Sequence, residues 1–198
     1  MTLTNGYHEV PGGKLAAVVT SFEMFAPPEP RPDPPAAAWL LRSAAAPGSE
    51  WYRGLFRRIG ADYLWASRLQ LSDTALRAIL DDPLVEVYAL RSDERDDGIL
   101  ELDFRIAGEC ELTFFGVGPA LLGTGAARWL FNRALERVWS RPLRRFWVHT
   151  CSLDHPAAPG FYLRSGFRPF KREVEIFNDP RASGIYPAGT APGVPLLL

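Results

Sequence analysis

The stretch that decides the fold begins Glu109-Cys-Glu-Leu-Thr-Phe-Phe-Gly-Val117 and continues through Leu122-Gly-Thr-Gly-Ala-Ala127. Its first part is rich in apolar and aromatic residues, which predicts a strand that ends at Val117. Pro119 stops strand pairing because it lacks an N–H group, and the small residues of the second part open a helix. Apolar residues at helical spacing then predict one apolar helix face, formed by Ala127, Leu130, Phe131, Ala134, Leu135 and Val138.

The segments on either side of this stretch predict a mixed sheet. Leu84–Leu90 and Ile99–Ile106 alternate apolar and polar residues around a charged turn at 93–98, so they form an antiparallel meander with the strand that starts at Glu109. Downstream, Arg145–Cys151 is largely apolar and predicts a strand covered on both faces. Strand, helix and strand in this order imply a parallel pair. A last strand is expected at Arg168–Phe177.

The N-terminal third contains one further strand and two helices. Leu15–Phe25 predicts the strand, and 51–59 and 72–80 predict the helices. Between them, residues 27–35 hold six prolines in nine positions, which excludes a helix or a central strand. We interpret this segment as a stiff surface connector, the alternative being a ligand for a proline-recognising domain.

Composition limits the class of protein. The chain has 198 residues, of which 47% are hydrophobic and 23% charged, with a net charge of −1, so nothing favours binding to nucleic acid or an anionic membrane. Two cysteines are too few for a disulfide scaffold or a structural zinc site. Residues 1–10 lack the apolar core of a secretory signal. We expect a cytoplasmic protein with a single domain at 1–178 and an irregular C-terminal tail at 179–198.

The loop before the predicted helix is a candidate phosphate site. Small residues let the backbone approach a ligand, and the free N–H groups of a helix start suit phosphate oxygens. The loop is not a P-loop, because no Gly-Lys-Ser/Thr follows it. It is a poor dinucleotide fingerprint, because the preceding strand belongs to a meander. The alternative is a glycine-rich turn that binds nothing.

Two motifs resemble the GNAT superfamily of N-acetyltransferases. The family's Gln/Arg-x-x-Gly-x-Gly/Ala motif corresponds to 122–127, with Leu122 in the Gln/Arg position. Its Asn-x-x-Ala-x-x-x-Tyr-x-x-x-Gly-Phe motif is similar to 155–167, with His155 in the Asn position and Tyr162 matching directly. Residues 147–156 also resemble an uncharacterised bacterial subgroup of this family.

The resemblance implies an α/β fold with a GNAT-like mixed sheet. Its N-terminal half is antiparallel, its two central parallel strands, which end at Val117 and Cys151, splay apart at their C-terminal ends, and helices cover both faces. It also implies direct transfer of an acetyl group from acetyl-CoA, without a metal, to the amine of a small molecule. The residues expected to hold the cofactor are Phe115, Gly116, Val117, Leu122, Gly123, Thr124, Gly125, Ala126, Ala127 and His155.

The resemblance also suggests the catalytic groups. An aliphatic ammonium must lose a proton before it attacks, and Glu111 matches the strand position of a glutamate base in some relatives. Because the strand register is unknown, three other carboxylates stay open as the base: Glu101, Asp103 and Glu109. Tyr162 matches the general acid for the leaving thiolate. His149 is interpreted as a core histidine, and Cys151 as an acyl-accepting nucleophile is a minor alternative.

Aromatic and arginine side chains in and after the first helix predict the acceptor pocket. Trp51, Arg53, Trp65 and Arg68 lie within 18 residues and suit an amine that carries a carboxylate. The alternative is an aromatic core with a solvated arginine face. Two alternatives remain for the whole chain: a non-catalytic acyl-CoA-binding sensor or interaction module, and an enzyme that uses another acyl group. A homodimer is compatible with the sequence.

Overall fold

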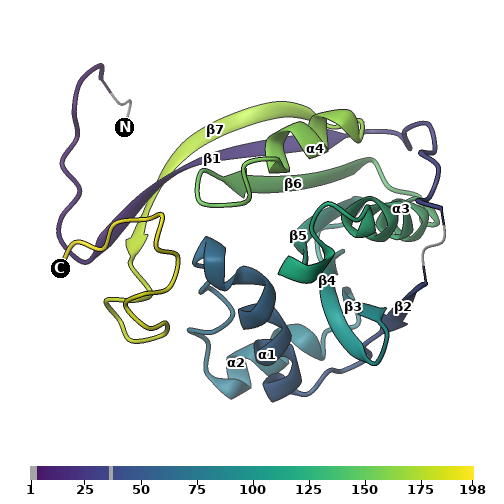
Figure 1. Cartoon of the computed structure of the whole chain (residues 1–198). Helices are drawn as coiled ribbons and strands as arrows, with labels where there is room; N and C mark the ends of the chain where they lie inside the picture. The colour runs from purple at the N-terminus through teal and green to yellow at the C-terminus, as the bar shows by residue number, and fades with distance from the viewer. Residues whose placement is uncertain (1–3, 36–37) are drawn as a thin grey trace.

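The computed structural model describes residues 4–35 and 38–198, and its centre is a seven-stranded sheet in the order β2-β3-β4-β5-β6-β1-β7 (Figure 1). Residues 1–3 of the stretch expected to lack a secretory signal lie outside the described residues. No helix in the described ranges is both long and apolar enough to cross a membrane.

One half of the sheet is the predicted antiparallel meander. It consists of β2 (Trp39–Ser43), β3 (Val85–Ser92), β4 (Arg95–Asp103) and β5 (Glu109–Val117). The predicted charged turn is present but covers only residues 93 and 94, because β4 already begins at Arg95. Asp93 adopts φ 52°, which compresses the turn. The edge strand β2 was not predicted, because five residues after a proline-rich segment carry little periodicity.

The other half joins the two ends of the chain. The strand β6 (Arg145–Cys151) runs parallel to β5, which confirms the predicted parallel pair. On its other side lies β1 (Lys14–Met24), which is antiparallel both to β6 and to β7 (Arg168–Asn178). The N-terminal strand is therefore inserted between two C-terminal strands, and only β2 to β5 form the antiparallel N-terminal half.

Helices cover both faces of the sheet, as predicted. Neighbouring residues of β4 separate the two cores: Ile99 packs with the first pair of helices, and Leu100 packs with the second pair. Ser72 caps α2 by accepting a hydrogen bond from the Ala75 N–H at 3.2 Å. The first face carries α1 (Ser49–Gly60), η1 (Ala61–Tyr63) and α2 (Asp73–Leu80), and the second carries η2 (Pro119–Leu121), α3 (Ala126–Trp139) and α4 (Ala158–Arg164).

The proline-rich connector packs along α3. The side-chain amide of Asn132 donates hydrogen bonds to the backbone oxygen of Arg31 at 2.9 Å and to the Asp33 carboxylate at 2.7 Å. Pro34 is buried and lies against Gly125, where an added Cβ atom would come within 2.7 Å of its ring. The connector thus braces the start of α3.

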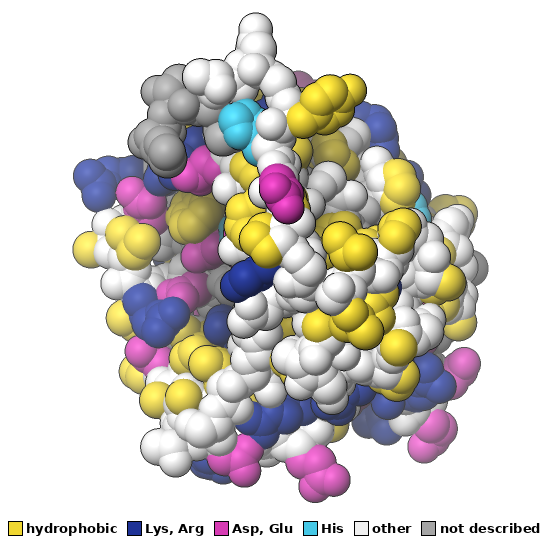
Figure 2. Space-filling view, turned by 90° about the vertical axis from the view of Figure 1, so that its left-hand side faces the viewer, with side chains coloured by type: hydrophobic (Ala, Val, Ile, Leu, Met, Phe, Trp, Pro, Cys, Tyr) yellow, Lys and Arg dark blue, Asp and Glu magenta, His cyan; other side chains and the backbone are white. Residues whose placement is uncertain are grey.

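The C-terminal tail is irregular but packed. Residues 179–198 contain no helix or strand, and a buried ion pair between Asp179 and Arg181 at 2.7 Å organises them. Tyr186 is buried, and its hydroxyl donates a hydrogen bond to the backbone oxygen of Trp65 at 2.7 Å. Figure 2 looks onto this end of the molecule, where hydrophobic side chains gather over the middle of the surface. The tail therefore supports the loop that follows η1.

Candidate active site

The central parallel strands separate after three residue pairs. Pairing between β5 and β6 ends at Glu111 and Trp147, whereas β5 runs on to Val117 and β6 to Cys151. Opposite β4, Thr113 is skipped in the ladder, and such a bulge bends the strand that carries it. Among the described residues, no strand pairs with this edge of β5 beyond Glu111, so backbone groups remain available to a ligand.

A cavity of about 850 Å³ opens where the strands separate. Its walls come from the ends of β5 and β6, the segment after η1, the start of α3, α4, and the end of β7. It is lined by many aromatic side chains and few charged ones, which is typical of a small-molecule site.

The loop before α3 has the backbone form that a phosphate cradle needs. Gly123 and Gly125 adopt φ values of +75° and +94°, which glycine tolerates best. Thr124 Oγ1 donates to the backbone oxygen of Leu121 at 2.7 Å and accepts from the Ala126 N–H at 3.3 Å. The first turn of α3 leaves backbone N–H groups without helical partners, so the loop fits the pyrophosphate of coenzyme A.

Each expected cofactor residue lies in or beside this region. Phe115, Gly116 and Val117 line the cavity on the free edge of β5, and Leu122, Gly123 and Ala127 line it from the loop. The Leu122 side chain is exposed and apolar, so a phosphate cradle here would consist of backbone N–H groups without the side-chain contact of the motif. His155 also lines the cavity, and its Nδ1 accepts a hydrogen bond from the Ala157 N–H at 3.1 Å.

Tyr162 points from α4 into the same cavity. The side chain is buried beside the rings of Phe22 and Phe167, and its hydroxyl makes no hydrogen bond to any described residue. Burial, with a smaller contribution from the charge of Asp154, raises the pKa of Tyr162 well above its usual value. The phenol therefore stays protonated at neutral pH and is free to donate.

Asp154 connects the walls of the cavity through hydrogen bonds, and the sequence did not predict this role. Its Oδ1 accepts a hydrogen bond from the Trp65 indole at 2.8 Å. Its Oδ2 accepts from the Thr150 hydroxyl at 2.7 Å and from the Cys151 N–H at 2.8 Å. The only signal in the sequence was its place directly before the second motif.

The four candidate carboxylates have different partners. Glu109 pairs with Arg145 at 3.1 Å, and Asp103 pairs with Arg105 at 2.5 Å. Glu101 is fully buried and accepts hydrogen bonds from Tyr52 and Arg68. Glu111 lies 3.5 Å from the His149 ring, measured from Oε1 to Nδ1, and His149 lines the cavity.

The interpretation of His149 as a core histidine was wrong. Its side chain is 47% exposed and lines the cavity where β5 and β6 separate. The neighbouring Glu111 carboxylate raises the pKa of His149, against the opposing effect of burial. Cys151 also lines the cavity, but burial raises the pKa of its thiol to about 11, so little thiolate exists at neutral pH.

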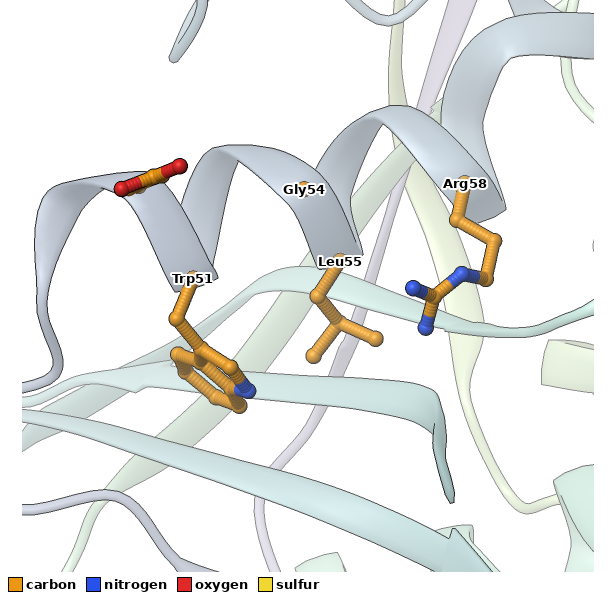
Figure 3. A pocket seen from close by; sticks show the side chains of 5 residues that line it. Trp51, Gly54, Leu55 and Arg58 are labelled. Carbon is orange, nitrogen blue, oxygen red and sulfur yellow. The ribbon is translucent and has the colours of Figure 1, made fainter.

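The structure brings two of the four acceptor candidates to the cavity. Trp65 and Arg68 line it. Trp51 lies in a separate depression of about 380 Å³ with Gly54, Leu55 and Arg58, where it points from α1 toward the strands (Figure 3). Its indole donates to Asp96 at 3.0 Å, and Arg53 is bound to Asp73. Trp51 and Arg53 are therefore not part of this cavity.

Arg68 is held in place from the buried side. Its Nη2 donates to Glu101 at 2.6 Å, and its guanidinium lies over the Phe114 ring, 5.1 Å from the ring centroid. Glu101 and Tyr52 together outweigh the effect of burial and raise the pKa of Arg68. Its Nε is buried and has no hydrogen-bond partner among the described residues.

Solved structures share this fold at low sequence identity. A functionally unknown conserved protein from Staphylococcus epidermidis has a TM-score of 0.61 at 12% identity, covering 84% of this chain and 63% of that protein. A GCN5-related N-acetyltransferase from Sphaerobacter thermophilus has a TM-score of 0.59 at 18% identity, covering 87% and 53%. An IAA acetyltransferase from Bacillus cereus has a TM-score of 0.52 at 16% identity, covering 68% and 79%. This chain therefore spans less than two thirds of the first two proteins.

Sequence comparison identifies the family. No curated protein sequence matches the chain. A family model described as "Acetyltransferase (GNAT) family" matches residues 49–167, which is more than half of the chain and includes the free edge of β5, the cradle and Tyr162. The chain belongs to the GNAT family of acetyltransferases.

Proposed function

We propose that this chain is an acetyl-CoA-dependent N-acetyltransferase that acts directly on the amine of a small molecule. The observation that carries the proposal is the cavity between β5 and β6, because it joins the cradle at α3 to Tyr162 and to His149. Acetyl-CoA would supply an activated acetyl thioester at this place. The residues of the chain would position it and move the protons.

Two backbone segments would hold the cofactor. The free edge of β5 at residues 115–117 can hydrogen-bond to an extended amide chain as another strand would. The N–H groups of residues 123–127 would bind the pyrophosphate. A donor fixed in this way needs little further ordering before attack, which is the main advantage of a positioned reaction.

Different elements lining the cavity would handle the two proton transfers. Tyr162 would donate to the leaving sulfur, because its buried phenol is protonated at neutral pH. The amine would lose its proton toward the side where Glu111 and His149 meet. The acid would thus lie on α4 and act on the thioester sulfur, and the base would lie on β5 or β6 and act on the amine.

Arg68 supports an acceptor that carries a carboxylate. It lines the cavity next to Trp65, and a guanidinium is a group that binds carboxylates in a forked geometry. Glu101 fixes the guanidinium in one orientation, which lowers the entropy lost on binding. We therefore propose an amino acid or a related acidic amine as the substrate class.

The test is release of coenzyme A from acetyl-CoA, measured against a panel of amino acids, neutral amines and polyamines. We expect turnover with acidic amines and little with polyamines. Calorimetric titration with acetyl-CoA runs in parallel. Binding without turnover on any amine would instead support a non-catalytic acyl-CoA sensor, and preference for propionyl- or succinyl-CoA would support another acyl donor.

A further inference from the structure

We propose that His149 is the group that takes the proton from the amine, and that Glu111 acts through it as a positioning residue. This inference rests on the proposed function and deepens it. The sequence led us to expect that Glu111 is itself the base. Here the lone pair that accepts the proton belongs to the imidazole of His149.

The register of the sheet brings the two side chains together. Glu111 pairs with Trp147 at the last shared position of β5 and β6, and His149 is two residues farther on the same face of β6. Its Nδ1 lies 3.5 Å from Glu111 Oε1. A proton on Nδ1 directed at this carboxylate leaves the lone pair on Nε2. His149 lines the cavity, whereas Glu111 lies behind it.

Three carboxylates around His149 favour its protonated form, while Lys14 and Arg68 line the same cavity. Glu111 on β5 has the largest effect, and Asp154 after β6 and Glu175 on β7 add to it. Asp154 is occupied by three hydrogen bonds, and Glu175 also lines the cavity. The imidazolium that forms after proton transfer is therefore stabilised by three carboxylates.

The proton affinity of an imidazole suits the reaction better than that of a carboxylate. Glutamate has an ordinary pKa of about 4.3, roughly six units below that of an aliphatic ammonium, and histidine about 6.5. General bases work best when their pKa lies near the operating pH. Raising the pKa of His149 brings it closer to that range.

The proposed step balances in atoms and electrons. Neutral His149 takes one proton from the ammonium at Nε2, and the freed lone pair forms the N–C bond to the acetyl carbon as the C–S bond breaks. Tyr162 donates a proton to the sulfur, which keeps the bonding electron pair, and the second amine proton restores the phenol. His149 then releases its proton to solvent. The net products are an amide, a thiol and one proton.

The first test is the pH dependence of kcat/KM for wild type, His149→Gln and Glu111→Gln. Wild type is expected to lose activity as the pH falls through the pKa of His149. His149→Gln should lower kcat by a factor on the order of 10² and abolish that acidic limb. Glu111→Gln should keep the limb but move it to lower pH. Unchanged activity in His149→Gln, or loss of the limb in Glu111→Gln, would overturn the assignment.

The second test does not need activity, so it separates failure of this inference from failure of the proposed function. The chain has three histidines, and NMR titration of their ring signals, assigned with His149→Gln, gives the pKa of His149 directly. Glu111→Gln should lower that pKa. The matched control, Glu109→Gln, removes a carboxylate that pairs with Arg145 and should leave the pKa unchanged. Equal effects of both variants would contradict the pairing, even in a protein without turnover.

Discussion

Replacing Arg68 by methionine should destabilise the protein strongly, because it leaves the Glu101 carboxylate buried without its positive partner. Glu101 is fully buried, and Arg68 is 12% exposed. Removing one member of such a pair costs about 3–5 kcal/mol. For a chain of this size each kcal/mol moves Tm by about 2–4 °C, so the expected fall is roughly 6–20 °C.

The double variant Glu101→Leu/Arg68→Met tests the reason for this loss. It removes both charges and keeps apolar volume, so its free energy of unfolding should return to within about 1 kcal/mol of wild type. The Tyr52 hydroxyl then loses its acceptor, which sets the remaining cost at about 1 kcal/mol. If Arg68 anchors the substrate carboxylate, this stable double variant should still have a raised KM for acidic amines.

The assay is urea unfolding followed by tryptophan fluorescence and circular dichroism. A matched control is Arg77→Met, whose i,i+4 pair with Asp81 is solvent-exposed and should contribute no more than about 0.5 kcal/mol. A loss of less than about 1 kcal/mol in Arg68→Met, or equal losses in the two methionine variants, would refute the argument that burial makes this pair important.

Three further predictions concern the cavity and the tail. Tyr162→Phe should lower kcat by a factor on the order of 10² while calorimetry shows unchanged acetyl-CoA affinity, because its buried hydroxyl has no hydrogen-bond partner within residues 4–35 and 38–198. Gly125→Val should cost about 1–2 kcal/mol in thermal unfolding and weaken cofactor binding, since its φ is +94° and Pro34 fills the Cβ position; Gly189→Ala, in open space, is the control. Arg181 lowers the pKa of Asp179, so the pair stabilises the fold above the ordinary Asp value of about 3.9 and this stability is lost as pH falls through the lowered pKa. Asp179→Asn should flatten this acid dependence in unfolding measurements.

The elements with local signals were predictable from the sequence. Alternation defined β3 and β5, and the glycine-rich loop with a helical apolar stripe defined the start of α3. The position of β1 was not predictable, because pairing across more than 120 residues between Glu23 and Trp147 leaves no local pattern. The packing of the tail was not predictable for the same reason. Tyr186 contacts Trp65 across more than 100 residues, and no periodicity in the sequence indicates this contact.

The site residues also fall into two groups, those predictable from local motifs and those that depend on long-range packing. The cradle and Tyr162 follow from short motifs whose residues lie close together in the chain. The acceptor candidates depended on which way helix α1 and the following segment face, and the sequence does not fix this for Trp51 or Arg53. The environment of His149 depended on the separation of two strands, which turns a central position into an exposed one.

The bulge at Thr113 in β5 underlies both parts of the proposed chemistry, which are cofactor binding and proton transfer. If Thr113 were accommodated without a bulge, β5 would continue in register beside β6, and Leu112–Val117 would lose their free edge. The same closure would narrow the cavity that His149 lines. In the proposed mechanism, cofactor binding and proton transfer therefore both depend on this backbone geometry rather than on a shared side chain. Substitutions at Thr113 that remove the bulge should impair both together, whereas His149→Gln should impair only the second.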